Sequence, residues 1–225
     1  MKKAPPIFAA LVSLPIAFAA AGACWWAAGP SLGLFFGGIA FAAVLTPALV
    51  CGESTCLGRF LAAAGIWLGI GVVWLAAVFT TDTTLGQWTE CAALLAAFIL
   101  AMAGLCVVLM RLRFSPVAAA AVVTVLSLAW LTWPVWLAPA LHGSAGQGIV
   151  SWLVPAHPLF AANAAVSNLG IWSEQTLIYR WSNMNQDLIF SLPRTVWPAV
   201  GLHAGIGIVF VLMSWRRTIP SQNPP

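Results

Sequence analysis

Apolar residues fill this chain in long runs, and short polar stretches separate the runs. Six of the runs are about 20 residues long, the length that an α-helix needs to cross the hydrocarbon core of a bilayer. None of them alternates apolar and polar positions, as a strand of a membrane barrel does. The pattern therefore predicts six transmembrane helices, at about residues 7–28, 31–50, 60–80, 91–110, 117–141 and 196–215.

The composition supports the same class of protein. Hydrophobic residues make up 62% of the 225 residues and charged residues 6%, whereas a soluble domain carries about a quarter charged residues. Lipid cannot hydrogen-bond the backbone, so only helices or closed barrels cross it. We expect an all-α fold, a polytopic membrane helix bundle in the lipid bilayer, with residues 1–225 as a single transmembrane domain.

Lysine and arginine indicate how the bundle is oriented. If six spans leave both termini on one side, that side carries seven of the nine basic residues: Lys2, Lys3, Arg59, Arg111, Arg113, Arg216 and Arg217. Because basic residues gather on the cytoplasmic side, we expect both termini in the cytoplasm and the protein in a bacterial inner membrane. This topology explains the net charge of +4, so no nucleic-acid partner is expected.

A seventh span at Ile149–Val166 would give the same charge balance, but its sequence argues against it. Pro155 and Pro158 lie three residues apart and leave backbone carbonyls without donors, which lipid cannot supply. His157 and Asn163 add polar side chains to the same stretch. We expect two short helices there, forming a hairpin that re-enters the membrane or lies at its interface.

This hairpin belongs to a long outer segment, residues 142–195, for which two further elements are predicted. A Gly-rich turn is expected at His142–Gly148, before the hairpin. After it, an amphipathic helix from Trp172 to about Leu188 is expected on the outer membrane surface or as a cap over the bundle. The apolar face of that helix consists of Leu177, Trp181, Met184 and Leu188.

Three pairs of glycines four residues apart allow close helix packing, within the chain or between two copies. They are Gly33 and Gly37, Gly65 and Gly69, and Gly201 and Gly205. Tryptophan is also abundant, with 13 residues, and many of them are expected in the aromatic belts at the membrane surfaces. Among these are Trp25, Trp26, Trp88, Trp133, Trp136, Trp197 and Trp215.

The candidate polar or binding residues are His142, His157, Glu174, Arg180, Asp187, Arg194 and His203. His203 lies inside the last span, where an ionisable side chain is a functional hypothesis, although a neutral histidine can also hydrogen-bond a neighbouring helix. The four charged residues form either a polar cluster on the cap or a solvated helix face. The five cysteines show no pattern of metal ligands, and no metal is expected.

Two chemistries are conceivable for these residues. Ser144 in the sequence HGSAG, with His203 in the last span, is similar to the pair used by intramembrane serine proteases of the rhomboid family. In that family, however, the serine starts a helix in a GxSG sequence, and here Ser144 is predicted in a turn. His142 and His203 are candidate haem ligands on the outer side, but the tryptophan-rich motif of cytochrome c biogenesis proteins is absent.

The predicted layout resembles the membrane subunit of an ABC-2-type exporter. Six spans, cytoplasmic termini and broken helices between the fifth and sixth spans carry the resemblance, and no sequence motif does. It implies a permease-like subunit of a multi-component transport complex, without catalytic activity of its own. No Walker A motif is present, so an ATPase would be a separate chain. The alternatives are a haem- or quinone-associated subunit of a redox or cytochrome-assembly complex, and a structural assembly protein.

The start of the chain resembles a signal peptide, since Lys2 and Lys3 precede an apolar stretch that ends in small residues. The stretch is long enough to cross the membrane, so we expect an uncleaved first helix. The loop Cys51–Arg59 is short for a helix that docks an ATPase, and no amphipathic helix precedes the first span. Both features differ from the exporter family.

Overall fold

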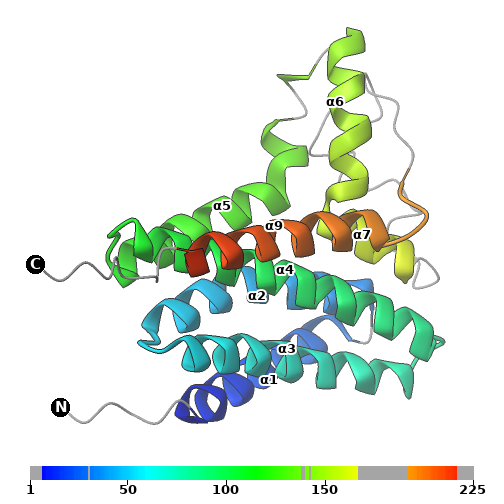
Figure 1. The fold of residues 1–225 in the computed structure, drawn as a ribbon. Coiled ribbons are helices and arrows are strands. Elements are labelled where there is room, and N and C mark those ends of the chain that lie inside the picture. The colour runs from blue at the N-terminus through cyan, green and yellow to red at the C-terminus, as the bar shows by residue number, and fades with distance from the viewer. Residues whose placement is uncertain (1–6, 30, 138–139, 142, 167–191, 217–225) are drawn as a thin grey trace, which may run out of the picture.

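The computed structural model describes residues 7–29, 31–137, 140–141, 143–166 and 192–216. Eight helices and no strands occur in these ranges (Figure 1). They are α1 (Ile7–Ala28), α2 (Leu32–Gly52), α3 (Cys56–Val78), α4 (Leu85–Arg111), α5 (Pro116–Trp136), α6 (Gly143–Ala156), α7 (Pro158–Ala165) and α9 (Trp197–Arg216).

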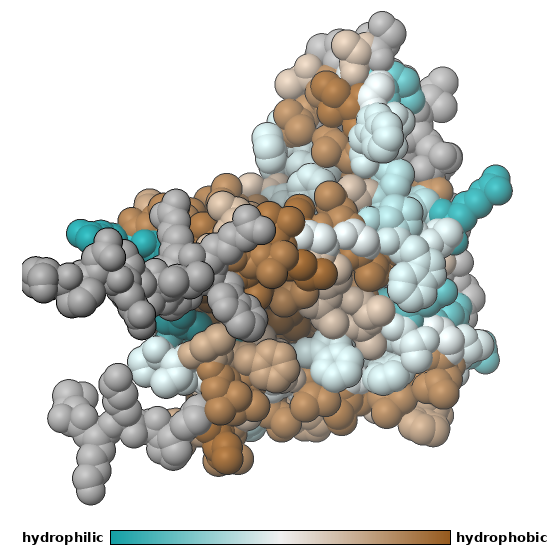
Figure 2. All heavy atoms as spheres, viewed as in Figure 1, coloured by the Kyte–Doolittle hydropathy of each residue, from teal (hydrophilic) through white to brown (hydrophobic). Residues whose placement is uncertain are grey.

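Six of these helices are long and apolar enough to cross a membrane: α1, α2, α3, α4, α5 and α9. The predicted all-α bundle with six spans is confirmed, and the chain is an integral membrane protein. Figure 2 shows large apolar side chains over much of the outer surface of the spans. Among those exposed by half or more are Val72, Val125 and Leu212, which is the distribution expected of side chains that contact lipid.

Two span boundaries differ from the predicted ones by five residues or more, because of local backbone chemistry. Helix α4 begins at Leu85, six residues before the predicted start, because Thr84 and Gln87 form a capping box. Gln87 N–H donates to Thr84 Oγ1 at 3.2 Å, and Thr84 N–H donates to Gln87 Oε1 at 2.8 Å. Helix α5 ends at Trp136, five residues before the predicted end and two residues after Pro134.

The spans run alternately in opposite directions, and the start of α1 lies at the same end of the bundle as the end of α9 (Figure 1). Glycines let some helices approach closely. A Cβ atom at Gly69 of α3 would lie 2.6 Å from the Leu14 carbonyl oxygen of α1. The Gly65 and Gly69 pair therefore packs within the chain. At Gly201 and Gly205, in contrast, an added Cβ atom would meet no atom of the described residues within 4 Å.

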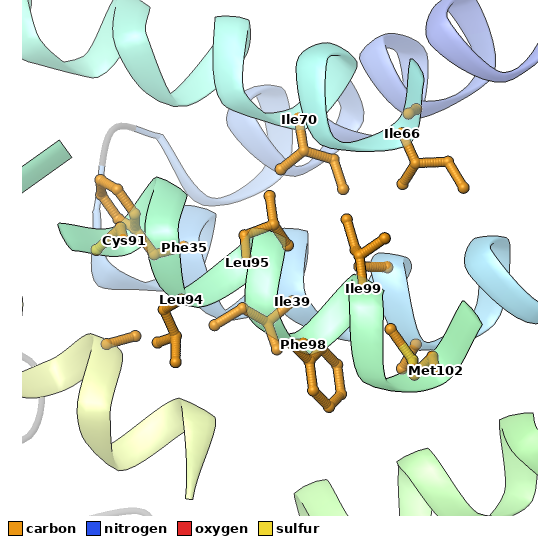
Figure 3. Packing of buried hydrophobic residues seen from close by; sticks show 14 of the residues in the cluster. Phe35, Ile39, Ile66, Ile70, Cys91, Leu94, Leu95, Phe98, Ile99 and Met102 are labelled. Atoms are coloured by element: carbon orange, nitrogen blue, oxygen red, sulfur yellow. The ribbon is translucent and has the colours of Figure 1, made fainter. Parts of the chain in front are cut away.

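The core lies where α2, α3 and α4 meet, and Figure 3 shows it from close by. Ile66 and Ile70 of α3 point towards one side of α4, and Phe98 points from its opposite side. Tryptophans link neighbouring helices, because their indole N–H groups donate hydrogen bonds to backbone carbonyls of the next helix. Trp74 Nε1 donates to Leu34 O at 3.2 Å, and Trp67 Nε1 donates to Ala92 O at 2.8 Å.

Helices α6 and α7 form the predicted broken hairpin between the fifth and last spans. The break lies at His157, which caps α7, and Pro158 occupies the first turn of that helix. Figure 1 shows α6 standing across the direction of the spans. Trp152 of α6 is 82% exposed, whereas Phe160, Ala161 and Ala162 of α7 are fully buried. The hairpin is thus anchored through α7.

The predicted Gly-rich turn before this hairpin is wrong, because α6 already begins at Gly143. Glycine at position 146 lets a helix form so close to Leu141. A Cβ atom at this position would lie 2.8 Å from the backbone carbonyl carbon of Leu141, which is too close. Because Gly146 has no side chain, the first turn of α6 lies directly against the chain that leaves α5. The amphipathic helix predicted over residues 172–188 lies outside the described residues.

Candidate functional site

The candidate site is built around a break in the hydrogen bonding of α5. Pro134 lies inside this helix and has no N–H, so the carbonyl of Trp130, four residues earlier, loses its helical donor. His157, at the junction of α6 and α7, replaces that donor. Its Nε2 atom lies 3.2 Å from Trp130 O and 3.2 Å from Leu131 O.

Both ring nitrogens of His157 are therefore occupied. Because Nε2 faces two carbonyl oxygens, it carries the proton, and Nδ1 is the acceptor. Nδ1 accepts from the Phe160 N–H at 3.4 Å and so caps α7. Burial holds the pKa of the ring well below its usual range, and the two carbonyls only partly oppose this effect. The neutral His157 ring therefore links α5 to α7 by hydrogen bonds. Both of its nitrogens are used in these bonds, so neither can bind a metal.

Aromatic rings surround His157 and connect it to His203. The ring of Trp130 lies 5.7 Å from that of His157 and 6.3 Å from that of His203, measured between centroids. Trp133 and Phe160 also pack against His157, at centroid distances of 6.0 Å and 4.8 Å. Trp133 is 1% exposed. Its predicted place in an aromatic belt is wrong, because Val150 and Val154 of α6 and Phe160 of α7 cover it.

The buried tryptophans of α5 also leave polar atoms without partners. The indole N–H groups of Trp130 and Trp133 are buried, and neither has a hydrogen-bond acceptor among the described residues. A buried donor without an acceptor costs about 1–3 kcal/mol, so two in adjacent turns mark an unusual region of the bundle.

His203 presents the opposite tautomer from His157. Its Nδ1 atom lies 2.7 Å from the carbonyl oxygen of Ala199, one turn earlier in α9, and must donate to it. Nε2 is then the acceptor, and it makes no hydrogen bond with any residue that the structure describes. The ring packs edge-on against Phe98 of α4, with centroids 5.4 Å apart, and is 5% exposed.

His203 lines a pocket of about 330 Å³ between α4, α5 and α9. Most of its wall is apolar, including Phe98 and Met102 of α4 and Phe210 of α9. Ser127 of α5 is the second small polar group in the wall and is 7% exposed. Its hydroxyl makes no hydrogen bond within the described part of the chain, to His203 or to any other residue.

The pocket opens towards the membrane rather than through it. Leu126, Leu202 and Ile206 line it and are each more than a third exposed on the outside of the bundle. None of the lining residues is charged. Such a wall, mostly apolar with a few placed polar groups, is typical of a binding site for an apolar small molecule.

The structure brings together two of the seven candidate residues, His157 and His203, because both rings pack against that of Trp130. Arg194 is exposed, ahead of α9. His142, Glu174, Arg180 and Asp187 lie outside the described residues. Ser144 belongs to the first turn of α6 and not to a turn between elements, so its predicted position no longer argues against a protease.

Ser127, Trp130 and Pro134 were not predicted to contribute to a site. One signal was available in the sequence: a proline inside a span leaves a carbonyl free, and a histidine in the adjoining segment can bond it. A bis-histidine haem site would need a second ligand besides His203, and its predicted partner, His142, is outside the described residues. Among the described residues, no group of three or more histidine, cysteine or acidic side chains is placed to hold a metal.

Comparison of the chain with protein-family models, with curated proteins and with solved structures gives no match in any of the three.

Proposed function

We propose that this protein is a permease-like membrane subunit of a multi-component transport complex, with an ATPase as a separate chain. The observation that carries the proposal is the hairpin of α6 and α7 between the last two spans. It is anchored in the bundle through His157 and buried α7, and α6 stands across the direction of the spans with Trp152 exposed (Figure 1). This is the position of the broken helices in ABC-2-type exporters, which the span layout resembles.

In this proposal, the end of the bundle that carries the start of α1 and the end of α9 faces the cytoplasm of a bacterial cell. Arg111 and Arg113 lie there, at and just after the end of α4, and both are exposed. A partner that couples ATP hydrolysis to transport would bind at this end. The hairpin at the opposite end would act as a gate or cap.

The test is purification of the tagged chain from its native membranes in a mild detergent, followed by identification of the bound proteins. We expect a P-loop ATPase in near-stoichiometric amount. Arg111→Glu with Arg113→Glu should reduce its recovery at least fivefold, because it reverses two charges at the proposed docking end. Arg194→Glu, an exposed arginine before α9, is the matched control and should change nothing.

Recovery of the chain alone at full yield, under conditions that keep other membrane complexes intact, would contradict the transport proposal. Equal loss of the ATPase with Arg194→Glu would contradict the proposed docking end.

A further inference from the structure

We propose that the pocket between α4, α5 and α9 binds a neutral, lipid-soluble molecule that carries a hydroxyl group. The hydroxyl donates a hydrogen bond to His203 Nε2 and accepts one from Ser127 Oγ. This inference goes beyond the transport role, because it requires no partner chain and no movement of substrate.

The hydrogen-bonding state of the two polar groups determines what they recognise. His203 uses Nδ1–H on the Ala199 carbonyl, so its free Nε2 requires a donor from the ligand. Ser127 has a hydroxyl that can donate to the same ligand group. A hydroxyl is at once a donor and an acceptor and satisfies both, whereas an ether or an ester carbonyl offers no donor to Nε2.

The absence of charge in the pocket wall excludes an ionic head group. A phosphate or carboxylate placed there would lose its hydration without gaining a cation, which costs several kcal/mol. The polar end of the ligand is therefore uncharged. Its body is apolar, because Phe98, Met102 and Phe210 provide only hydrocarbon, aromatic and thioether surface.

The position of the pocket also fits a ligand that arrives from the bilayer. His203 follows Trp197, the first residue of α9, by six residues, which is about 9 Å along the helix axis. At that depth a hydroxyl has no water to bond. The exposed side chains of Leu126, Leu202 and Ile206 place the opening on the lipid-facing side, so entry is lateral.

Two kinds of molecule supply this chemistry: isoprenoid alcohols and isoprenoid quinols. Equilibrium binding to the full chain in lipid nanodiscs tests both. One arm compares tritiated geranylgeraniol with its methyl ether, and the other compares 2-decyl-1,4-hydroquinone with its dimethyl ether. We expect the hydroxyl form to bind about five- to tenfold more tightly in at least one arm, as one to two neutral hydrogen bonds imply. The arm in which the hydroxyl form and its ether differ more in affinity shows whether the ligand is an alcohol or a quinol.

Variants locate the binding. Ser127→Ala should weaken the hydroxyl ligand about threefold and leave its ether unchanged. Ser13→Ala is the matched control, since Ser13 is also buried but lies in α1, away from the pocket. Ala101→Leu fills the pocket and should abolish binding of both forms. His203→Phe keeps an aromatic ring, removes the acceptor and should equalise alcohol and ether.

The proposal is overturned if, in both arms, the ether binds as tightly as its hydroxyl parent. It is also overturned if Ala101→Leu leaves the binding intact. The comparison of ligands uses the unmodified chain, so it decides the matter even if His203→Phe does not fold. Loss of ATPase co-purification would contradict the transport role and leave this binding result untouched.

Discussion

His157 joins α5 and α7 at a point where each helix has a backbone group without a helical partner. Its Nε2–H donates to the Trp130 carbonyl, which lacks a helical donor because of Pro134. Its Nδ1 accepts from the Phe160 N–H at the start of α7. His157 and Phe160 are each 1% exposed, and an unbonded buried group costs about 1–3 kcal/mol. One neutral imidazole therefore stabilises two helices and links them to each other.

This shared carbonyl predicts a specific coupling between His157 and Pro134. His157→Phe should lower the free energy of unfolding by about 2–3 kcal/mol, because it removes the donor to the Trp130 carbonyl and the side-chain cap of α7. Pro134→Ala restores a helical donor to that carbonyl. In the Pro134→Ala background, His157→Phe should therefore cost about 1 kcal/mol less. Unfolding in detergent mixtures measures all four proteins, and strictly additive effects would contradict the coupling.

The buried neutral ring also predicts how stability depends on pH. Burial lowers the pKa of His157 in the folded state, and the unfolded value is near 6.5. The unfolded state then binds the extra proton first. Stability is therefore complete above about pH 6.5 and falls as the pH drops below it, by up to about 1.4 kcal/mol per unit.

The same unfolding experiment, repeated between pH 7.5 and 5, tests this dependence. The decrease should be smaller in His157→Phe than in the unmodified protein. An equal slope in the two proteins would show that other groups cause it.

At the scale of elements, α1 and α3 are held together by backbone contact rather than by large side chains. Gly69 lies against Leu14 and Phe18 of α1, and there is no room for a methyl group. Gly71 lies two residues further along α3, and a Cβ atom added there would have nothing within 4 Å. These two glycines of one helix form a matched pair for measuring the packing.

We expect Gly69→Ala and Gly71→Ala to change the stability of the protein in opposite directions. Gly69→Ala forces the helices apart and should destabilise the protein by about 1–3 kcal/mol. Gly71→Ala should stabilise it by up to about 1 kcal/mol, because alanine favours the helix over glycine. Thermal unfolding of both variants in detergent is the measurement, and two equal shifts would count against tight packing of α1 on α3.

Hydropathy alone predicts most of this fold, because the length of an apolar run determines whether a helix can cross lipid. The broken hairpin was also predictable, since Pro155 and Pro158 leave carbonyls that lipid cannot satisfy. The pocket was not. It depends on which faces of α4, α5 and α9 meet, and a run that is apolar on all sides carries no such signal. Trp133 shows the same limit, because its burial comes from α6 and α7 and not from its own helix.

At the scale of the whole molecule, the topology depends on one count: whether the segment between α5 and α9 crosses the membrane. If α6 and α7 form a non-spanning hairpin, three spans separate the loop after α2 from the chain before α9. If the segment spans, four do. The orientation of the proposed docking end and the accessibility of the hairpin both follow from this number.

The most direct measurement is cysteine labelling from one side of the membrane. Ser54 and Thr195 are exposed, one in the loop after α2 and the other just before α9. Each is replaced by cysteine in a chain whose five native cysteines are replaced, and intact cells are treated with a membrane-impermeant maleimide. We predict that Thr195→Cys reacts in intact cells and that Ser54→Cys reacts only after permeabilisation. Reaction of both positions from the same side would contradict the six-span topology.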